Sequence, residues 1–176
     1  NDGIADEKDF ACGDLPYVTH RKTITNIQNL GGNMYTVTYQ LEVKNNGGVL
    51  GQYYLVDAPS FDNDIAINNA LYTSNVPGNP GAPLVGVGPW TLASNQSILP
   101  GVTHTYTIVV KVTLDLRASS GGDNVYRSCG QSIPGNPTAG EGLFNESRMD
   151  SNGDGIPEEK DKACGDLPYI ITNKTI

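Results

Sequence analysis

The sequence predicts an all-β protein: an antiparallel Greek-key sandwich of immunoglobulin type, with about seven strands and acidic calcium-loop linkers at both ends. Three observations favour this class. Apolar residues alternate with polar ones along several segments, clusters of Gly, Pro, Asn and Asp separate these segments, and no segment has the periodicity of a helix of any length. With 176 residues, the chain has the size of one domain, or of two at most.

Two segments carry the clearest strand pattern. In the first, apolar residues alternate with polar ones from Tyr35 to Val43, and the run ends at the turn sequence Asn-Asn-Gly-Gly. The second, residues 102–114, alternates in the same way. Shorter β-rich runs predict strands at residues 17–25, 52–56, 65–72, 90–98 and 143–149. The insert at residues 75–88 is rich in Pro and Gly, and we expect it to form a contact loop specific to this module.

The acidic residues are concentrated in two segments. Residues 2–14 hold five carboxylates and residues 150–166 hold six, out of 19 acidic residues in the chain. The net charge of −8 and the scattered Lys and Arg residues argue against binding to nucleic acid. No apolar run is long enough to span a membrane, and the acidic first residues do not resemble a signal peptide.

The two acidic segments belong to an internal repeat. Residues 1–24 and 153–176 align without a gap and share 16 of 24 residues, including the strings ACGDLPY and KTI. A match at a fixed offset, here 152 residues, is typical of an array of modules. We therefore expect a truncated linker at residues 1–14, a sandwich module at 15–149, a second linker at 150–166 and the first strand of the next repeat at 167–176.

The second linker has the pattern of a calcium-binding loop. Residues 150–161 place oxygen-bearing side chains at positions 1, 3, 5 and 12 of a 12-residue loop, with Gly155 at the sharp turn. The predicted ligands are Asp150, Asn152, Asp154, Ile156 through its carbonyl, Glu158 directly or through water, and Asp161. In the first linker, which lacks the opening positions, the equivalents are Asp2, Ile4, Asp6 and Asp9. The alternative for either segment is a turn rich in Asn, Asp and Gly without an ion.

Several segments also carry a family resemblance. They are YTVTYQLEVKNNGG at residues 35–48, PGVTHTYTIVVKVTLD at 100–115, GEGLFNES at 140–147, DSNGDG at 150–155 and ACGDLP at 163–168. Together they resemble the bacterial conserved-repeat modules of very long secreted surface proteins, and the DxNxDG loop is similar to that of dockerins. The resemblance implies an immunoglobulin-like fold and a role as a surface, adhesive or filament repeat, and it implies no catalytic residues.

The three cysteines reduce to two per repeat, because Cys12 and Cys164 occupy the same position in successive modules. In an immunoglobulin topology, Cys12 precedes the first strand and Cys129 lies in the last connection, so these two are predicted to meet. Cys164 is then left for the next repeat. The alternative pair, Cys129 with Cys164, requires the linker to fold back on the module. Either disulfide indicates an extracellular, oxidising setting.

No catalytic motif accompanies the two histidines, and we expect the protein not to be an enzyme. His104 is expected to be a strand residue with a satisfied ring. The aromatic residues are expected in the core rather than in a sugar-binding platform. An amide cross-link between Lys and Asn is a further hypothesis, with Lys44 or Lys111 as the strand lysine and no partner indicated.

The function expected from these features is structural. The chain is predicted to be a tandem-repeat module of an extracellular adhesin or filament on a bacterial cell surface, stiffened by calcium at the linkers. Its expected partners are neighbouring repeats, joined covalently or by addition of the strand at residues 169–176 to another sheet. The alternative is a secreted module that binds a carbohydrate or a protein through the 75–88 loop and exposed aromatic residues.

Overall fold

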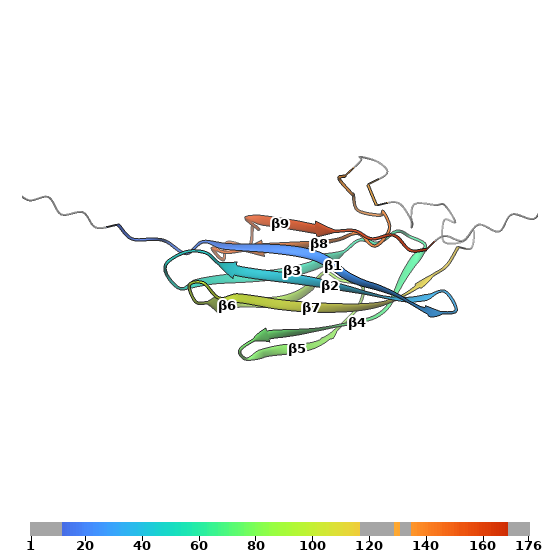
Figure 1. Ribbon diagram of the computed structural model, residues 1–176, viewed down its shortest axis with the longest axis horizontal. Coiled ribbons are helices and arrows are strands. Elements are labelled where there is room, and N and C mark those ends of the chain that lie inside the picture. Colours follow the sequence, from blue (N-terminus) through green and yellow to red (C-terminus); the bar gives the residue numbers. More distant parts are fainter. Residues whose placement is uncertain (1–11, 117–128, 131–134, 169–176) are drawn as a thin grey trace, which may run out of the picture.

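The computed structural model describes residues 12–116, 129–130 and 135–168. In this part of the chain, nine strands form two antiparallel sheets (Figure 1). The larger sheet contains, in spatial order, β1 (Val18–Gly31), β2 (Met34–Asn45), β7 (Thr103–Leu114), β4 (Ile65–Val76) and β5 (Asn79–Leu84). The smaller sheet contains β6 (Trp90–Ile98), β3 (Gly51–Pro59), β8 (Asn145–Asp150) and β9 (Glu159–Ala163). The predicted all-β sandwich of immunoglobulin type is confirmed.

The alternating pattern of the sequence becomes the inner face of the sandwich. Side chains of successive strand residues point to opposite faces, so the apolar set of β2 and the apolar set of β7 meet across one register, with Tyr39 opposite Ile108. The fully buried members of these two strands are Val37, Tyr39, Leu41, Val43, Tyr106, Ile108, Val110 and Val112. These two strands lie in the larger sheet, and their buried side chains form one side of the core.

Two strands lie where the sequence predicts none. Residues 79–84, inside the predicted contact loop, form β5, which pairs with β4 in a hairpin at the edge of the larger sheet. Residues 159–163 form β9, which pairs with β8 at the edge of the smaller sheet. Both segments lack apolar alternation, because an edge strand gains its pairing from one neighbour and exposes much of its side-chain surface.

The prediction that residues 150–166 form a linker between modules is therefore wrong. The first part of this segment is the turn between β8 and β9, and the second part is a strand of the sandwich itself. β9 also lies beside β1, so it closes the gap between the two sheets. The backbone N–H of His20 donates to Glu159 at 2.9 Å, and that of Lys22 donates to Asp161 at 2.6 Å.

The segments before β1 and after β9 leave the sandwich at opposite ends of its long axis (Figure 1). The turn between β8 and β9 lies at the end where the segment before β1 emerges (Figure 1). The proposed next strand, residues 169–176, and the early acidic residues 1–11 lie outside the described part of the chain. No helix among the described residues has the length and apolarity needed to cross a membrane.

Candidate functional site

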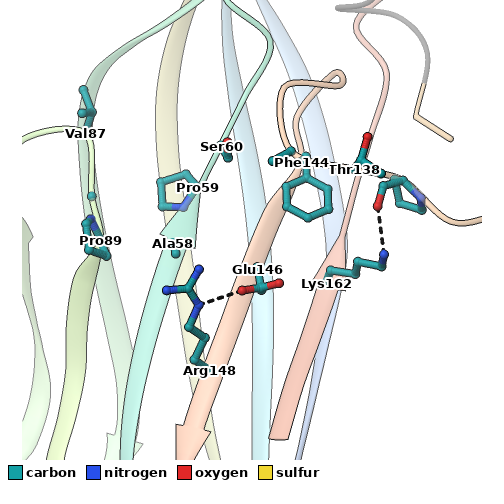
Figure 2. Close-up of a pocket in the computed structure, with 13 residues that line it drawn as sticks. Ala58, Pro59, Ser60, Val87, Pro89, Thr138, Phe144, Glu146, Arg148 and Lys162 are labelled. Carbon is teal, nitrogen blue, oxygen red and sulfur yellow. Dashed lines mark hydrogen bonds and ion pairs between the residues drawn. The ribbon is translucent and has the colours of Figure 1, made fainter. Parts of the chain in front are cut away.

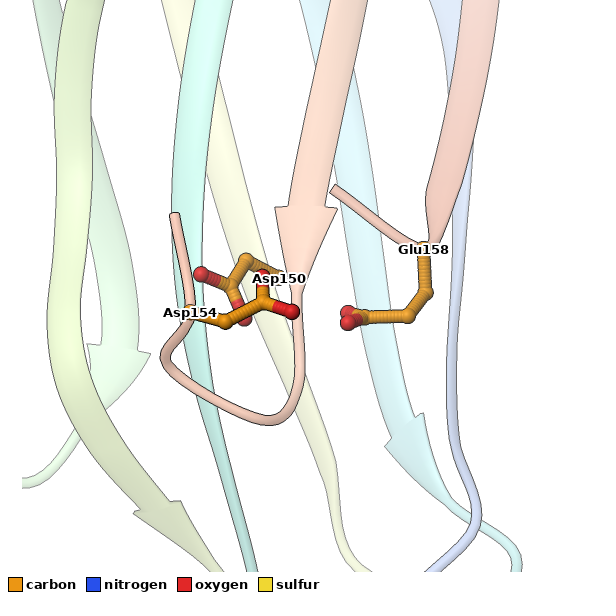
Figure 3. Close-up of side chains that lie close together, drawn as sticks. All are labelled: Asp150, Asp154 and Glu158. Carbon is orange, nitrogen blue, oxygen red and sulfur yellow. The ribbon is translucent and has the colours of Figure 1, made fainter. Parts of the chain in front are cut away.

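The turn between β8 and β9 gathers three acidic side chains at its mouth (Figure 3). Asp150 ends β8, Asp154 lies at the tip, and Glu158 precedes β9, and one carboxylate oxygen of each lies within 4.8 Å of the others. Calcium ligands lie about 2.3 to 2.6 Å from the ion, so two oxygens that share an ion are separated by at most about 5 Å. The spacing and the hard oxygen donors therefore fit a calcium ion.

Backbone N–H groups organise this loop around Asp150. Its Oδ1 accepts from Asn152 at 3.0 Å and from Gly153 at 2.6 Å, and its Oδ2 accepts from Gly155 at 2.9 Å. Desolvation opposes ionisation of this carboxyl, but the three N–H donors outweigh it and hold the pKa of Asp150 below its ordinary value. Asp150 is therefore an anchored anion at the base of the loop.

Of the other predicted ligands, Asn152 and Ile156 lie beside the acidic cluster, whereas Asp161 lies away from it. Asn152 lies beside the cluster, because its Nδ2 donates to Asp154 at 3.2 Å, and the N–H of Ile156 donates to Asp154 at 2.7 Å. Asp161 does not join the cluster: its Oδ2 accepts from the backbone of Lys22, and its Oδ1 accepts from the backbone of Lys162. The prediction of Asp161 as the twelfth-position ligand is wrong, because β9 begins at Glu159 and places Asp161 beside β1.

The predicted ligands of the first linker, which are Asp2, Ile4, Asp6 and Asp9, lie outside the described residues. Nothing follows for them from the geometry of the β8–β9 turn. The pattern that led to Asp161 is that of a loop followed by a helix. Here the loop is followed by a strand, which turns the last carboxylate away from the cluster.

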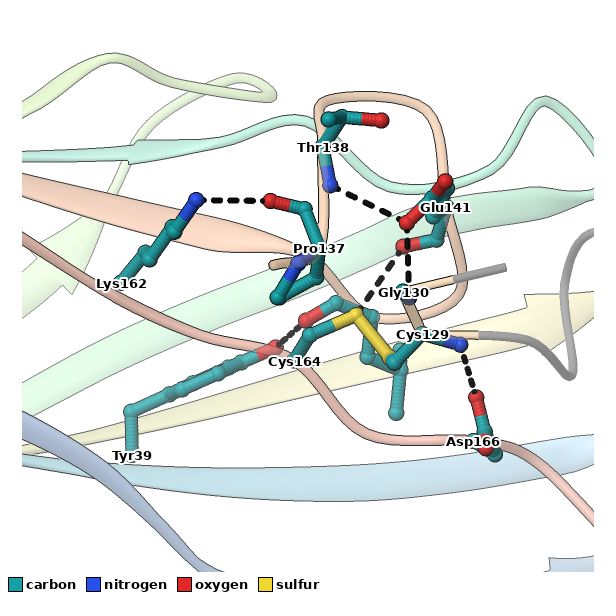
Figure 4. Close-up of a disulfide and its surroundings, with 10 residues drawn as sticks. Tyr39, Cys129, Gly130, Pro137, Thr138, Glu141, Lys162, Cys164 and Asp166 are labelled. Carbon is teal, nitrogen blue, oxygen red and sulfur yellow. Dashed lines mark hydrogen bonds between the residues drawn. A yellow bond between two sulfur atoms is a disulfide. The ribbon is translucent and has the colours of Figure 1, made fainter. Parts of the chain in front are cut away.

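The disulfide joins Cys129 to Cys164, and Cys12 is free and exposed (Figure 4). The predicted pair of Cys12 with Cys129 is wrong, and the alternative in which the segment after β9 folds back is confirmed. The reason is β9: because this strand returns along β8, it brings Cys164 back to the segment that precedes β8. The segment before β1, which contains Cys12, leaves the sandwich at the opposite end (Figure 1).

The string after β9 is docked on the module by more than the disulfide. The backbone N–H of Cys129 donates to Asp166 at 2.7 Å (Figure 4). The backbone N–H of Leu143 donates to the carbonyl of Gly165 at 2.9 Å. Leu167 is 2% exposed and belongs to the core. A Cβ at Gly165 would lie 2.8 Å from Cδ1 of Ile24 and 2.7 Å from Cδ1 of Ile27, so a larger residue here would force these two side chains to shift.

The identical string before β1 has a different environment. Leu15, the equivalent of Leu167, is 80% exposed, and Tyr17 is 61% exposed. A side chain added at Gly13, the equivalent of Gly165, would meet no atom within 4 Å. The copy of the string after β9 is therefore packed into the sandwich, whereas the side chains of Leu15 and Tyr17 in the copy before β1 are exposed.

This difference makes a stability prediction. Replacing Leu167 by Ala should lower the free energy of unfolding by about 2 to 5 kcal/mol, because it leaves a cavity in the core. Replacing Leu15 by Ala, the matched control in the other copy of the string, should change it by less than about 0.5 kcal/mol. Urea denaturation measures both. Equal losses for the two variants would show that the string is not docked as described.

A second cluster, which the sequence analysis did not find, crosses the core between the sheets. Lys22 on β1, Asp57 on β3 and Asn145 on β8 are 3%, 0% and 0% exposed. The ammonium of Lys22 contacts Asp57 Oδ1, and Asn145 Nδ2 donates to Asp57 Oδ2 at 2.8 Å. Burial lowers the pKa of Lys22 below its ordinary value, and the nearby charge of Asp57 opposes that shift only in part.

The remaining candidates from the sequence are structural. His104 is buried, and its Nδ1 lies 2.8 Å from the Tyr53 hydroxyl, so its ring is satisfied as predicted. Tyr53, Tyr72 and Trp90 are buried core residues rather than a sugar-binding platform. Lys44 is exposed and Lys111 is half-buried, so neither lies in the core where a cross-link between the sheets would form.

The comparisons with known proteins assign no family. No family model matches the chain, and no curated protein matches it. Among solved structures, it is similar to one titled as the X-ray structure of Northeast Structural Genomics Consortium target SoR45, with 10% identity over 92% of this chain and 96% of that chain. The TM-score is 0.30, and this likeness carries no argument about fold or function.

Proposed function

We propose that the chain is a structural module of a tandem-repeat protein, an adhesin or filament outside the cell on a bacterial surface. The observation that carries this proposal is the contrast between the two ACGDLPY strings. Leu167 is buried in the core of its module, whereas the equivalent Leu15 is almost fully exposed. The exposure of Leu15 is explained if each ACGDLPY string packs into the core of the module that precedes it in the chain, as Leu167 does here.

The positions of the ends support a linear arrangement. Because the two strings lie at opposite ends of the long axis, successive modules would follow one another end to end (Figure 1). With a repeat of 152 residues, Cys12 would pair with the cysteine equivalent to Cys129 in the preceding module. The connection from β9 to the first strand of the following module would then span only residues 164–169. A connection this short limits bending between neighbouring modules.

Calcium has a defined place in this arrangement. Asp150, Asp154 and Glu158 would hold the ion in the β8–β9 turn, with Asn152 beside them. That turn lies at the end of the sandwich where the segment before β1 emerges (Figure 1), so in an array it would face the preceding module. A bound divalent cation neutralises the three carboxylates and restricts the turn, so we expect it to stiffen the module near the joint.

The calcium proposal predicts a shift in thermal stability. With free calcium at 100 times its dissociation constant, linkage stabilises the folded state by about 2.7 kcal/mol, or about 5 to 10 °C in Tm for a chain of this size. The measurement is calorimetric melting in calcium and in chelator. Asp150→Asn combined with Asp154→Asn should abolish the shift, and Glu42→Gln, which removes one exposed charge from β2, should retain it. Identical melting of the wild-type protein in the two buffers would refute the site.

The array itself is tested on the native polypeptide from its source. Electron micrographs should show a string of equal globules with a regular spacing. Single globules with no neighbours would contradict the proposal. This result is independent of the calcium measurement, so the two parts of the proposal can fail separately.

A ligand-binding module is the second candidate, because the outer face of the smaller sheet is hollowed (Figure 2). The hollow has a volume of about 520 Å³ and includes Val87 and Gly88 from the insert, with Phe144 at its wall. Arg148 on its floor pairs with Glu146 at 2.7 Å. Screening the protein against a glycan array separates the two functions: specific binding that is lost in Arg148→Ala favours recognition, and a spacer binds nothing.

A further inference from the structure

We propose that Lys22 and Asn145 become joined by an amide bond between Lys22 Nζ and Asn145 Cγ, with Asp57 as the catalytic acid and base. The juxtaposition that carries this inference is a nucleophile, a carboxyl group and a carboxamide in one buried cluster. Both nitrogens lie against the same carboxylate, Lys22 at Oδ1 and Asn145 at Oδ2. The inference goes beyond the proposed module function and does not require it.

The surroundings of the cluster are those that make an amine reactive. All three side chains are at least 97% buried, and the ring of Tyr39 lies with its centroid 5.0 Å from Lys22 Nζ. Tyr39 is itself held, because its hydroxyl donates to the carbonyl of Leu143 at 2.7 Å. Such a site excludes water, which would otherwise solvate the ammonium and hydrolyse intermediates.

Burial shifts Lys22 toward the neutral amine that the reaction requires. Desolvation lowers the pKa of Lys22, and transfer of one proton from Lys22 to Asp57 converts two buried charges into an amine and a carboxylic acid. The neutral amine is the nucleophile, as in other lysines activated by an apolar pocket. The charged pair would have to be sustained without water, and this is costly in a core.

A rotation of the Asn145 side chain would place its carbonyl oxygen where Asp57 can donate a proton to it. Asn145 Oδ1 is buried and has no hydrogen-bond partner, while Asn145 Nδ2 donates to Asp57. The O and N atoms of an amide are exchanged by a rotation of the side chain, which would place Oδ1 against the carboxylic acid formed at Asp57. That hydrogen bond polarises the carbonyl and satisfies the unpaired oxygen at the same time.

The reaction balances without an outside reagent. The Lys22 amine attacks Cγ of Asn145 as Asp57 donates its proton to the amide oxygen, which gives a tetrahedral intermediate. Asp57 then accepts a proton from the former amine and delivers one to the Asn145 nitrogen, which leaves as ammonia, and the hydroxyl proton returns to Asp57 as the carbonyl re-forms. The C–N bond to Lys22 replaces the C–N bond to ammonia, no atom is oxidised or reduced, and the product is a secondary amide.

The bond would join β1 of the larger sheet to β8 of the smaller sheet. β1 is the first strand of the module, and β8 precedes the strand that leads out of it. Tension applied along the chain would then pass through a covalent link rather than through the hydrogen bonds of the sandwich. The repeated KTI string places a lysine, Lys174, at the equivalent position of the next copy.

The test is mass spectrometry of the full chain after reduction and denaturation. The mass should be lower than that of the sequence by one ammonia. Digestion should yield one branched peptide that joins Lys22 to Asn145, which separates the cross-link from ammonia loss by cyclisation at Asn-Gly sequences. Asp57→Asn should yield the linear peptides and the unmodified mass, whereas Lys44→Arg, an exposed strand lysine, should retain the branched peptide.

Three outcomes would overturn the proposal. The first is a wild-type protein that is folded by near-ultraviolet circular dichroism and yields only linear peptides. The second is a branched peptide that joins Lys22 to Asp57, with loss of one water, because the roles of Asp57 and Asn145 would then be wrong. The third is a complete cross-link in Asp57→Asn. Each wild-type outcome is read without a variant, so misfolding of Asp57→Asn does not obscure the result.

Discussion

Replacing Lys22 by Met should lower the free energy of unfolding by about 3 to 5 kcal/mol, because Asp57 then loses the buried nitrogen that its Oδ1 contacts. Lys22 and Asp57 are 3% and 0% exposed, so water cannot take the place of the lost nitrogen. Guanidinium denaturation monitored by circular dichroism measures the loss. Lys44→Met, on the exposed face of β2, is the matched control and should change stability by less than about 0.5 kcal/mol.

A double variant distinguishes a lost polar partner from lost packing. Lys22→Met combined with Asp57→Leu removes both buried polar groups and should recover part of the stability lost in Lys22→Met alone. A double variant that is less stable than the single one by a further large amount would contradict the assignment of the loss to an unpaired Asp57. An effect of Lys22→Met no larger than that of Lys44→Met would contradict the burial of the cluster.

Replacing Cys164 by Ser should lower the free energy of unfolding by about 4 kcal/mol in the chain-entropy description, because the disulfide closes a loop with a sequence separation of 35. The loss should appear without added reductant, and the reductant should have little further effect on the variant. The matched control is Cys12→Ser, which removes an exposed, unpaired cysteine and should leave the stability unchanged. A large loss in Cys12→Ser would show that Cys12 has a partner within the chain.

The central strands were predictable from the sequence because each has one apolar face and one polar face. β2 and β7 alternate strictly between core and surface, so their position in the sandwich follows from the period of two. β9 was not predictable in this way. Its sequence, EKDKA, is almost wholly polar, and the strand is held by pairing with β8 and by the carboxylates of Glu159 and Asp161 on the backbone of β1.

The missed strand explains the errors that followed from it. Without β9, the acidic segment was interpreted as a linker, Asp161 as a ligand and Cys164 as a cysteine of the next module. With β9 in place, the chain returns along β8 and brings Cys164 to Cys129. The cluster of Asp150, Asp154 and Glu158 was predictable because its spacing is local, whereas the disulfide depends on the path of a strand that local patterns do not reveal.

The Lys22 cluster was missed for a different physical reason. A lysine within a strand is normally interpreted as an exposed residue, because burying an ammonium without a partner is costly. The partners of Lys22 are distant in sequence, since Asp57 is on β3 and Asn145 is on β8 of the other sheet. Only the packing of the two sheets brings the three side chains together, so no window of the sequence contains the signal.

Peptide mapping under non-reducing conditions, after alkylation of free thiols in the folded protein, tests most directly whether each ACGDLPY string closes the module that precedes it. The structure predicts one disulfide-linked pair of peptides that contains Cys129 and Cys164, and an alkylated Cys12. A linked pair that contains Cys12 and Cys129 would contradict this account, because the string before β1 would then close its own module and nothing would connect it to a neighbour.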